Sequence, residues 1–396
     1  MRIQKGPYLQ DAKQDSITIR WETDRPSAGE VIVYRTVFAH VPPHYGDPSL
    51  EKEIVTGEPL RFFTSTGTFH SVTVTGLTAG CDYCYEAICT AGDDRITSGR
   101  QPFRTAPEKD SAISFVVTAE NGGCGGHLLP YMDPIIELIR REHPDFLLSV
   151  GDITANGLEE SSWKCCLFDP FRTLLTTTPF YPCVGNHEVD SSVVRPEEIG
   201  FRYSNYLKYF AFPRFYSFDY GCAHFCVLDS PTMMQDIRFS DTDHYIPVPV
   251  DDFEHSEQYL FAQRDLAASQ AKWKFVVFHF PAYTSSIFGH PDMQVFCPLF
   301  EKYGVDIVFN SHAIVYERSH PIRENTVAKN GVRYILPGGY NDVSQWFRDK
   351  QNGFAAKIAG RPGYVHVSLT PYTLELQAID YEGKLFDMLT LNKGED

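Results

Sequence analysis

The sequence predicts an all-β domain followed by a layered α/β domain, and three observations lead to this fold class. Residues 1–107 alternate apolar and polar side chains in short runs, with no helical period. From residue 108 onward, fully apolar runs alternate with amphipathic helical stretches. The charged, proline-bearing stretch TAPEKDSA lies between the two patterns. We therefore expect two domains, 1–107 and 108–396, which the length of 396 residues also favours.

The first domain is predicted to be a β-sandwich. Its short runs include SITIRWET, GEVIVYR, FHSVTVTGL and DYCYEAIC, and turn residues separate them. Alternation with a period of two over such lengths is typical of half-buried antiparallel strands.

The second domain is predicted to build its sheets from buried strands. AISFVVTAE (112–120) and PDFLLSVGD (144–152) are apolar runs of strand length, and 129–143 between them has helical spacing. KFVVFHFP and VDIVFNSH repeat the strand pattern after a helix expected at 258–273. Residues 363–383 alternate again and predict added antiparallel strands.

Composition excludes some classes of partner. Hydrophobic residues make up 43% of the chain and charged residues 22%, while the formal net charge is −16. An acidic chain is a poor match for nucleic acid or an anionic membrane, which require a basic face. No apolar run approaches about 18 residues, and the N-terminus shows no apolar core of the kind found in signal peptides. We expect a cytoplasmic protein that acts on a small molecule.

Polar side chains gather where the predicted buried strands end, and ligands of open α/β sheets collect at such carboxyl ends. Each residue alone is weak evidence, because a lone histidine after a strand is more often structural. Together, one aspartate, one asparagine and two histidines suit a divalent ion such as Mn, Fe or Zn. The strand-end residues are Glu120, Asn121, Asp152, Asn186, His187, Glu188, His279 and His312.

These blocks resemble a known family. GD (151–152), GNHE (185–188), FHFP (278–281) and SHAIVYER (311–318) are similar to the motifs of the calcineurin-like metallophosphoesterases, and most similar to the purple acid phosphatase branch. The stretch KGPYLQ with SITIRWET resembles the fibronectin-III-like domain of that branch. The resemblance implies a four-layer second domain, in which two mixed sheets are flanked by helices.

The resemblance also implies roles for individual residues. Asp152, Asn186, His279 and His312 match the ligands of one metal ion, and His187 matches the histidine that assists the leaving group. For the second ion of the family, only the shared Asp152 is unchanged. The other positions carry Glu120 for aspartate, Gly122 for a histidine, Ala155 for tyrosine and Ile314 for histidine. The expected cofactor is therefore one divalent or trivalent transition metal ion, with the second ion in doubt.

Several assignments stay open at this stage. Glu120 is either a weak ligand of a second ion or a base, and Asn121 and His127 are candidates for substrate binding. Three functions are compatible with the residues. They are hydrolysis of small phosphate esters with one tight ion, a different reaction at a single ion, and a binding or scaffold role without catalysis. Other donors near the second ion would be Cys124, Asn156 and His320.

Overall fold

The computed structural model describes residues 1–40, 51–122, 130–189, 203–239, 245–249, 253–289, 291–341, 347 and 352–394. The chain divides into two units. The first comprises Met1–Glu108 and Phe171–Phe180, and the second comprises Lys109–Pro170 and Tyr181–Asp396.

The first unit is built from β-strands, as predicted. β2 pairs antiparallel with β1, β3 and β4, and register shifts interrupt its ladders, for example between Glu22 and Ser27. Trp21 and Tyr85 are fully buried in its core. The strands are β1 (Ile3–Gln10), β2 (Ser16–His40), β3 (Glu51–Thr75), β4 (Asp82–Ala91), β5 (Asp94–Thr97) and β6 (Gln101–Arg104).

Residues 171–180 pack with the first unit, although they lie inside the sequence range predicted for the second domain. They contain the short helix α3 (Arg172–Leu175). Thr176 joins this segment to two strands, because its carbonyl accepts a hydrogen bond from the Tyr85 hydroxyl at 2.8 Å and its own hydroxyl contacts the carbonyl of Pro7 at 3.2 Å.

The second unit contains two mixed sheets. In the first sheet β7 and β8 are parallel and the pairs on the other side of β7 are antiparallel. In the second sheet β11, β14, β15 and β19 are parallel, and antiparallel strands flank them. The six-stranded sheet has the order β23 (Leu385–Asn392), β22 (Thr373–Asp380), β21 (Gly363–Leu369), β7 (Ile113–Thr118), β8 (Phe146–Ser149), β9 (Phe180–Tyr181). The seven-stranded sheet has the order β10 (Tyr216–Tyr220), β11 (Ala223–Val227), β14 (Trp273–Val277), β15 (Ile307–Phe309), β19 (Arg333–Pro337), β16 (Tyr316–Ser319), β20 (Ala355–Ala359).

Aromatic side chains fill the space between these two sheets. Phe115 of β7 lies edge-on to Phe225, Phe275 and Phe309, with ring centroids 5.2, 5.7 and 6.4 Å away. All four rings are fully buried. Because side chains alternate along a strand, the neighbouring residues of β11, β14 and β15 face the opposite side of the sheet.

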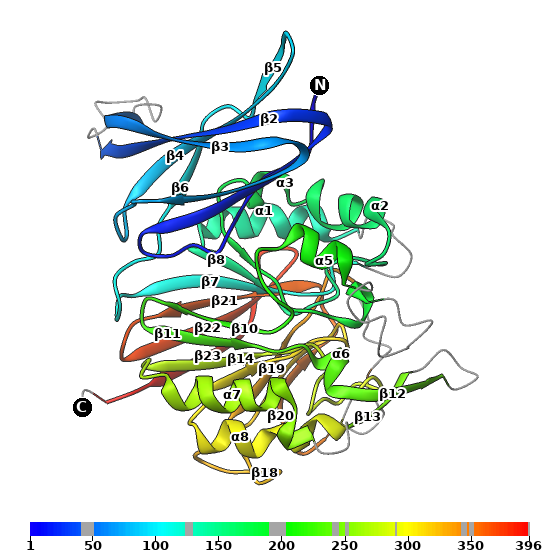
Figure 1. Cartoon of the computed structure of the whole chain (residues 1–396). Helices are drawn as coiled ribbons and strands as arrows, with labels where there is room; N and C mark the ends of the chain where they lie inside the picture. Colours follow the sequence, from blue (N-terminus) through cyan, green and yellow to red (C-terminus); the bar gives the residue numbers. More distant parts are fainter. Residues whose placement is uncertain are drawn as a thin grey trace. The chain divides into compact units, whose positions relative to one another are not determined.

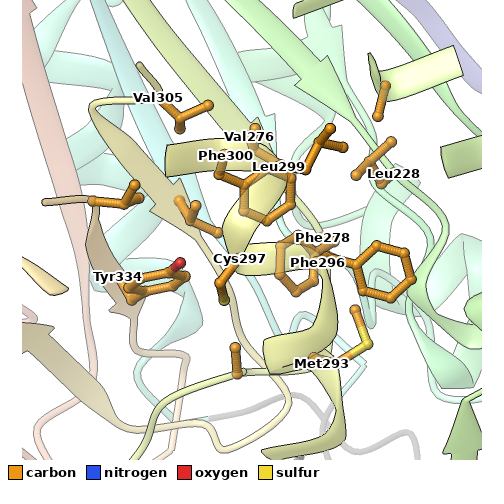
Figure 2. Packing of buried hydrophobic residues seen from close by; sticks show 14 of the residues in the cluster. Leu228, Val276, Phe278, Met293, Phe296, Cys297, Leu299, Phe300, Val305 and Tyr334 are labelled. Carbon is orange, nitrogen blue, oxygen red and sulfur yellow. The ribbon is translucent and has the colours of Figure 1, made fainter. Parts of the chain in front are cut away.

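Helices cover that opposite side. α7 (Glu257–Ala268) and α8 (Cys297–Lys302) run along the seven-stranded sheet (Figure 1). Figure 2 shows the buried cluster that joins them to it, which includes Val276, Phe296 and Phe300. The Ser256 hydroxyl caps α7 by accepting the Tyr259 N–H at 3.2 Å, which satisfies one donor of the first turn.

A helix also contacts the outer face of the six-stranded sheet. α1 (Met132–Glu142) contacts β21 and buries Ile135 and Ile139. Near its end, Glu142 accepts a hydrogen bond from the Tyr364 hydroxyl at 2.8 Å. Two mixed sheets flanked by helices are therefore present, as predicted.

The remaining elements connect or decorate these layers. No helix in the described parts of the chain has the length and apolar character needed to cross a membrane. The short elements are α2 (Glu160–Trp163), a π-helical turn (Lys164–Phe168), α5 (Ser204–Tyr209), α6 (Ser230–Met233), three 3₁₀ turns (Asn186–Glu188, Phe253–His255 and Pro291–Phe296), the pair β12 (Met234–Phe239) and β13 (Tyr245–Pro249), and the pair β17 (Ile322–Arg323) and β18 (Thr326–Val327).

Candidate metal centre

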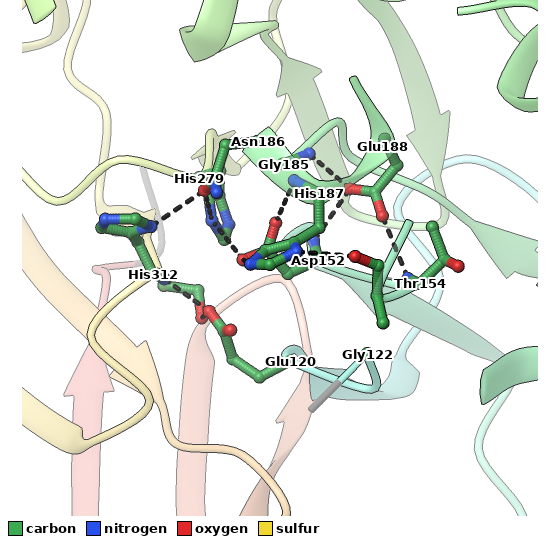
Figure 3. A network of polar contacts seen from close by, with 12 residues as sticks. Glu120, Gly122, Asp152, Thr154, Gly185, Asn186, His187, Glu188, His279 and His312 are labelled. Carbon is green, nitrogen blue, oxygen red and sulfur yellow. Dashed lines mark hydrogen bonds and ion pairs between the residues drawn. The ribbon is translucent and has the colours of Figure 1, made fainter. Parts of the chain in front are cut away.

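Four polar side chains follow the carboxyl ends of strands from both sheets. Asp152 follows β8 and Asn186 follows β9 in the six-stranded sheet, whereas His279 follows β14 and His312 follows β15 in the seven-stranded sheet. Figure 3 shows the four side chains gathered at one place. The site thus lies where the two sheets end side by side, as expected for α/β ligand sites.

The donor atoms have the spacing of ligands around one ion. His279 Nε2 is 3.1 Å from both Asp152 Oδ2 and Asn186 Oδ1, and His312 Nδ1 is 2.9 Å from Asn186 Oδ1. The donor atoms of Asp152, His279 and His312 all lie within 4.8 Å of one another. Two ligands at right angles and about 2.1 Å from an ion are about 3.0 Å apart. A mixed oxygen and imidazole set of this spacing fits Mn, Fe or Zn.

The imidazole of His279 is oriented by a carbonyl behind it. Its Nδ1 donates to the carbonyl oxygen of Val150 at 2.8 Å, so Nε2 is left to face the other donors. Burial alone would lower the pKa of His279, but the Asp152 carboxylate beside it raises that pKa to about 9. Burial would likewise raise the pKa of Asp152, and the nearby imidazoles instead hold it below its ordinary value. A metal ion that binds to this group therefore displaces the proton that His279 holds in its absence.

Two glycines allow the loops to come this close. Gly151 has a φ of 94°, and a Cβ built on it would lie 2.7 Å from His279 Nδ1. A Cβ on Gly185 would lie 2.3 Å from the backbone nitrogen of Asp152. The glycine that precedes each oxygen ligand in GD and GN is thus required by packing.

Glu188 has a structural role that the sequence did not reveal. Its buried carboxylate accepts hydrogen bonds from the backbone N–H groups of Gly185 (2.6 Å), Asp152 (2.9 Å) and Thr154 (3.1 Å). Burial raises the pKa of this carboxyl to about 7. The side chain ties the loop of Asp152 to the loop of Asn186. Glu188 is the third residue of the short turn Asn186–Glu188, a position from which a glutamate commonly accepts a hydrogen bond from the residue before the turn. That position in the sequence could have predicted this structural role.

His187 stands beside the ligand group and faces outward. Its Nδ1 is 2.9 Å from the carbonyl of Ala155, and its Nε2 is 3.9 Å from Asp152 Oδ2. The side chain is 47% exposed. The Asp152 charge raises the pKa of His187 and so favours its protonated form.

Glu120 lies at the end of β7 and points to the loop of His312. Its Oε1 accepts hydrogen bonds from the Ser311 hydroxyl and from the His312 backbone N–H, both at 2.6 Å. Burial raises the pKa of Glu120 to about 7, and the Asp152 charge acts in the same direction. Among the described residues, the group whose donor atoms all lie within 4.8 Å of one another contains Asp152 but not Glu120.

The other three positions of the second ion carry no donor side chain. A Cβ on Gly122 would lie 2.3 Å from the carbonyl oxygen of Thr154, so the backbone there has no room for any side chain. Ala155 uses its carbonyl for His187. Ile314 is buried in a small apolar cluster with Ala313, Val315 and Leu336.

The structure also shows what surrounds the remaining predicted residues. Asn121 is 1% exposed, and neither its Oδ1 nor its Nδ2 has a hydrogen-bond partner in the described part of the chain. His127 and Cys124 lie outside the described residues. Asn156 and His320 are exposed, and the Asn156 amide donates to Glu159 Oε1 instead.

Comparisons with known proteins agree with this architecture. The family model described as "Calcineurin-like phosphoesterase" matches residues 123–316. Purple acid phosphatase 15 of Arabidopsis thaliana is 26% identical over 376 residues, which cover 82% of this chain and 65% of that protein. The probable inactive purple acid phosphatase 27 of the same plant is 29% identical over 271 residues, covering 54% and 39%. The chain therefore spans less than two thirds of the length of either relative.

A solved structure shows the same fold. The purple acid phosphatase PPD1 from yellow lupin (Lupinus luteus) seeds superposes with a TM-score of 0.77 at 19% identity, over 98% of this chain and 74% of that one. Because the superposition covers nearly the whole chain, it includes the strand-rich N-terminal region as well as the sheets that bear the site. Residues 123–316 therefore match the calcineurin-like phosphoesterase model, and the chain is similar to the purple acid phosphatases in sequence and in fold.

Proposed function

We propose that this protein hydrolyses small phosphate esters with a single tightly held metal ion. The observation that carries the proposal is the contrast between two sets of positions. Asp152, Asn186, His279 and His312 bring four donor atoms together at the spacing of one ion. Gly122, Ala155 and Ile314, where a second ion would need donors, offer none.

The ion would be held by the carboxylate of Asp152, the amide oxygen of Asn186 and the two imidazoles. When bound, it supplies Lewis acidity to a phosphoryl oxygen and lowers the pKa of water. The protein fixes the donors through Val150, which orients His279, and through Glu188, which holds both loops.

The chain's own acid in this proposal is His187. Because Nδ1 is bonded to the Ala155 carbonyl, the proton available to a substrate is the one on Nε2, which lies 3.9 Å from Asp152 Oδ2 at the edge of the candidate ligand group. A protonated imidazole there donates to the ester oxygen as the phosphorus–oxygen bond breaks. The amide of Asn121, which has no partner among the described residues, supports a role in binding the substrate, since a buried amide without partners costs about 1–3 kcal/mol.

The proposal also covers the size of the substrate, the domain assignment and the location of the protein. A net charge of −16 favours a small ester over a long polyanion. We assign residues 1–107 to a fibronectin-III-like domain and 108–396 to the phosphoesterase domain. The cytoplasmic location remains a prediction.

Metal analysis and turnover test the proposal together. Protein purified without chelator is expected to contain about one transition metal ion per chain, and His312→Ala to lose most of it. A generic phosphomonoester and a phosphodiester are the two substrates to assay. Two tight ions per chain would contradict the single-ion site. One ion without turnover of either ester would favour a different reaction at the same centre.

A binding or scaffold role is the second candidate, and the loss of donors at Gly122, Ala155 and Ile314 favours it. Protein that retains no metal and shows no turnover, yet folds, would support that role. The intact ligand set argues against it, because buried donors without an ion or a ligand to bind are costly.

A further inference from the structure

The loop that carries His312 needs support, because its backbone is strained. His312 and Ile314 have φ values of 66° and 56°, in the left-handed region. A β-branched isoleucine is a clear outlier there, and such conformations persist only when surrounding contacts determine them. The Ser311 N–H donates to the carbonyl of His279, which follows β14 of the same sheet, at 2.8 Å.

Glu120 provides that support from the other sheet. It is 5% exposed and follows β7 of the six-stranded sheet, while Ser311 and His312 follow β15 of the seven-stranded sheet. A single oxygen, Oε1, accepts both the Ser311 hydroxyl and the His312 N–H at 2.6 Å. Figure 3 shows the Glu120 carboxylate next to the backbone of His312. Hydrogen bonds to a carboxylate are about twice as strong as neutral ones.

Packing keeps the Glu120 side chain in this direction. A Cβ on Gly339 would lie 2.9 Å from Ile314 Cγ2 and 3.0 Å from Glu120 Cβ, so both side chains pack against the same glycine. The Glu120 N–H also donates to the Gly151 carbonyl at 3.1 Å, which fixes the start of its segment. The methylene stem is thus confined next to the apolar side chain of Ile314, and the carboxylate extends to the loop.

We propose that Glu120 is a positioning residue whose carboxylate fastens the His312 loop to the six-stranded sheet, and we name the contacts of Glu120 with Ser311 and His312 the Glu120 latch. The proposal deepens the single-ion function and rests on it for its effect on the metal. The latch sets the position of the His312 imidazole relative to Asn186 through hydrogen bonds between the two sheets. Glu120 is then neither a ligand of a second ion nor a base.

The test compares three replacements in the full chain. Glu120→Ala removes the acceptor, Ser311→Ala removes one donor, and Glu120→Gln keeps an acceptor oxygen but loses the charge. The Zn²⁺ dissociation constant is measured by competition with a chromophoric chelator. The melting temperature is measured separately on chelator-treated protein, so that no metal contributes to it.

The latch predicts a specific pattern. Glu120→Ala should weaken Zn²⁺ binding by about 10- to 100-fold, the usual effect of removing a residue that orients a ligand. Glu120→Gln should recover most of that loss. If Glu120→Gln binds Zn²⁺ as weakly as Glu120→Ala, the charge matters more than the hydrogen bonds and the latch is wrong. Unchanged Zn²⁺ affinity in Glu120→Ala would also overturn it.

Glu317 supplies a matched control. Its carboxylate, 1% exposed, accepts the Thr284 hydroxyl at 2.7 Å and the Ser285 N–H and hydroxyl at 2.7 and 2.8 Å. Glu317→Ala therefore removes a similar buried carboxylate away from the candidate ligands. It should lower the melting temperature but leave the Zn²⁺ affinity unchanged. An equal loss of affinity in Glu317→Ala would show that destabilisation alone explains the result.

Failure of the latch and failure of the single-ion function are distinguishable. The melting temperatures of the single variants and of the double variant Glu120→Ala/Ser311→Ala form a cycle that needs no metal. Coupling in that cycle supports the latch even if the wild type binds no Zn²⁺. Additive losses would overturn it even if the wild type binds one ion tightly.

Discussion

His187 shows how a single backbone contact determines what a side chain offers to a substrate. The bond from Nδ1 to the Ala155 carbonyl leaves the Nε2 proton available to a substrate, and the Asp152 charge favours the protonated ring. His187→Ala is therefore expected to lower kcat by about 10²–10⁴-fold, the range for loss of a general acid. Metal content should not change, because no candidate ligand is removed. The assay is turnover of a phosphomonoester with metal content measured in parallel.

The exposed His320 is the control for that experiment. It lies outside the candidate ligand group, and His320→Ala should keep both turnover and metal content. An unchanged rate in His187→Ala would contradict the role assigned to the ring. Loss of metal in His187→Ala would mean instead that the residue supports the ligands.

Residue identities pointed to the candidate oxygen and imidazole donors, but not to the groups that hold them. Asp152, His279 and His312 could be found because aspartate and histidine after apolar strands are chemically distinctive, and the structure brings their donor atoms together. Ser311 and the carbonyl of Val150 carry no such signal, since serines and backbone carbonyls occur everywhere in a sequence. Their partners depend on how two sheets meet, which local patterns do not encode.

At the scale of elements, His224 joins two strands and a helix of the second unit. Its Nδ1 lies 2.7 Å from Asp219 in β10 and its Nε2 lies 2.8 Å from Asp265 in α7, while His224 itself belongs to β11. Burial alone would lower its pKa, but the two carboxylates raise it to about 9. The folded protein therefore holds this proton more tightly than the unfolded chain does.

That raised pKa predicts a pH dependence of stability. The contribution of His224 is fully present below its unfolded pKa of about 6.5, and it is lost as pH rises through 9. The loss is at most about 3.5 kcal/mol, since one pKa unit corresponds to about 1.4 kcal/mol. Chemical denaturation of the wild type between pH 6.5 and 9.5 should show a decline in unfolding free energy that His224→Gln lacks. Parallel curves for the two proteins would refute the assignment.

The positions of the strands and helices along the chain were easier to predict than the elements against which they pack. The apolar runs 112–120 and 144–152 contain β7 and β8, and the helix expected at 258–273 is α7 at Glu257–Ala268. Burial on both faces leaves a strong sequence signal in such strands. The segment 171–180 had no comparable signal. Its membership of the first unit depends on long-range contacts such as Thr176 with Tyr85.

At the scale of the whole molecule, the ligands of one ion belong to two sheets of the same unit. Asp152 and Asn186 come from the six-stranded sheet, and His279 and His312 come from the seven-stranded sheet. An ion bound by all four therefore connects the two sheets in the folded state only. Such binding stabilises the unit by about 2.7 kcal/mol when the free ion is at one hundred times its dissociation constant.

Hydrogen exchange measured by mass spectrometry tests this connection in the full chain. Treatment with a chelator should speed the exchange of peptides that contain residues 150–154, 184–188, 277–280 and 309–314, because the open ends of both sheets lose a shared support. Peptides from β2 and β4 should exchange at the same rate with and without the ion, since the first unit contains none of the candidate ligands. His312→Ala should exchange like the chelated wild type in both conditions. Faster exchange in only one of the two sheets would mean that the ion does not bridge them, and the four-ligand assignment would then have to be abandoned.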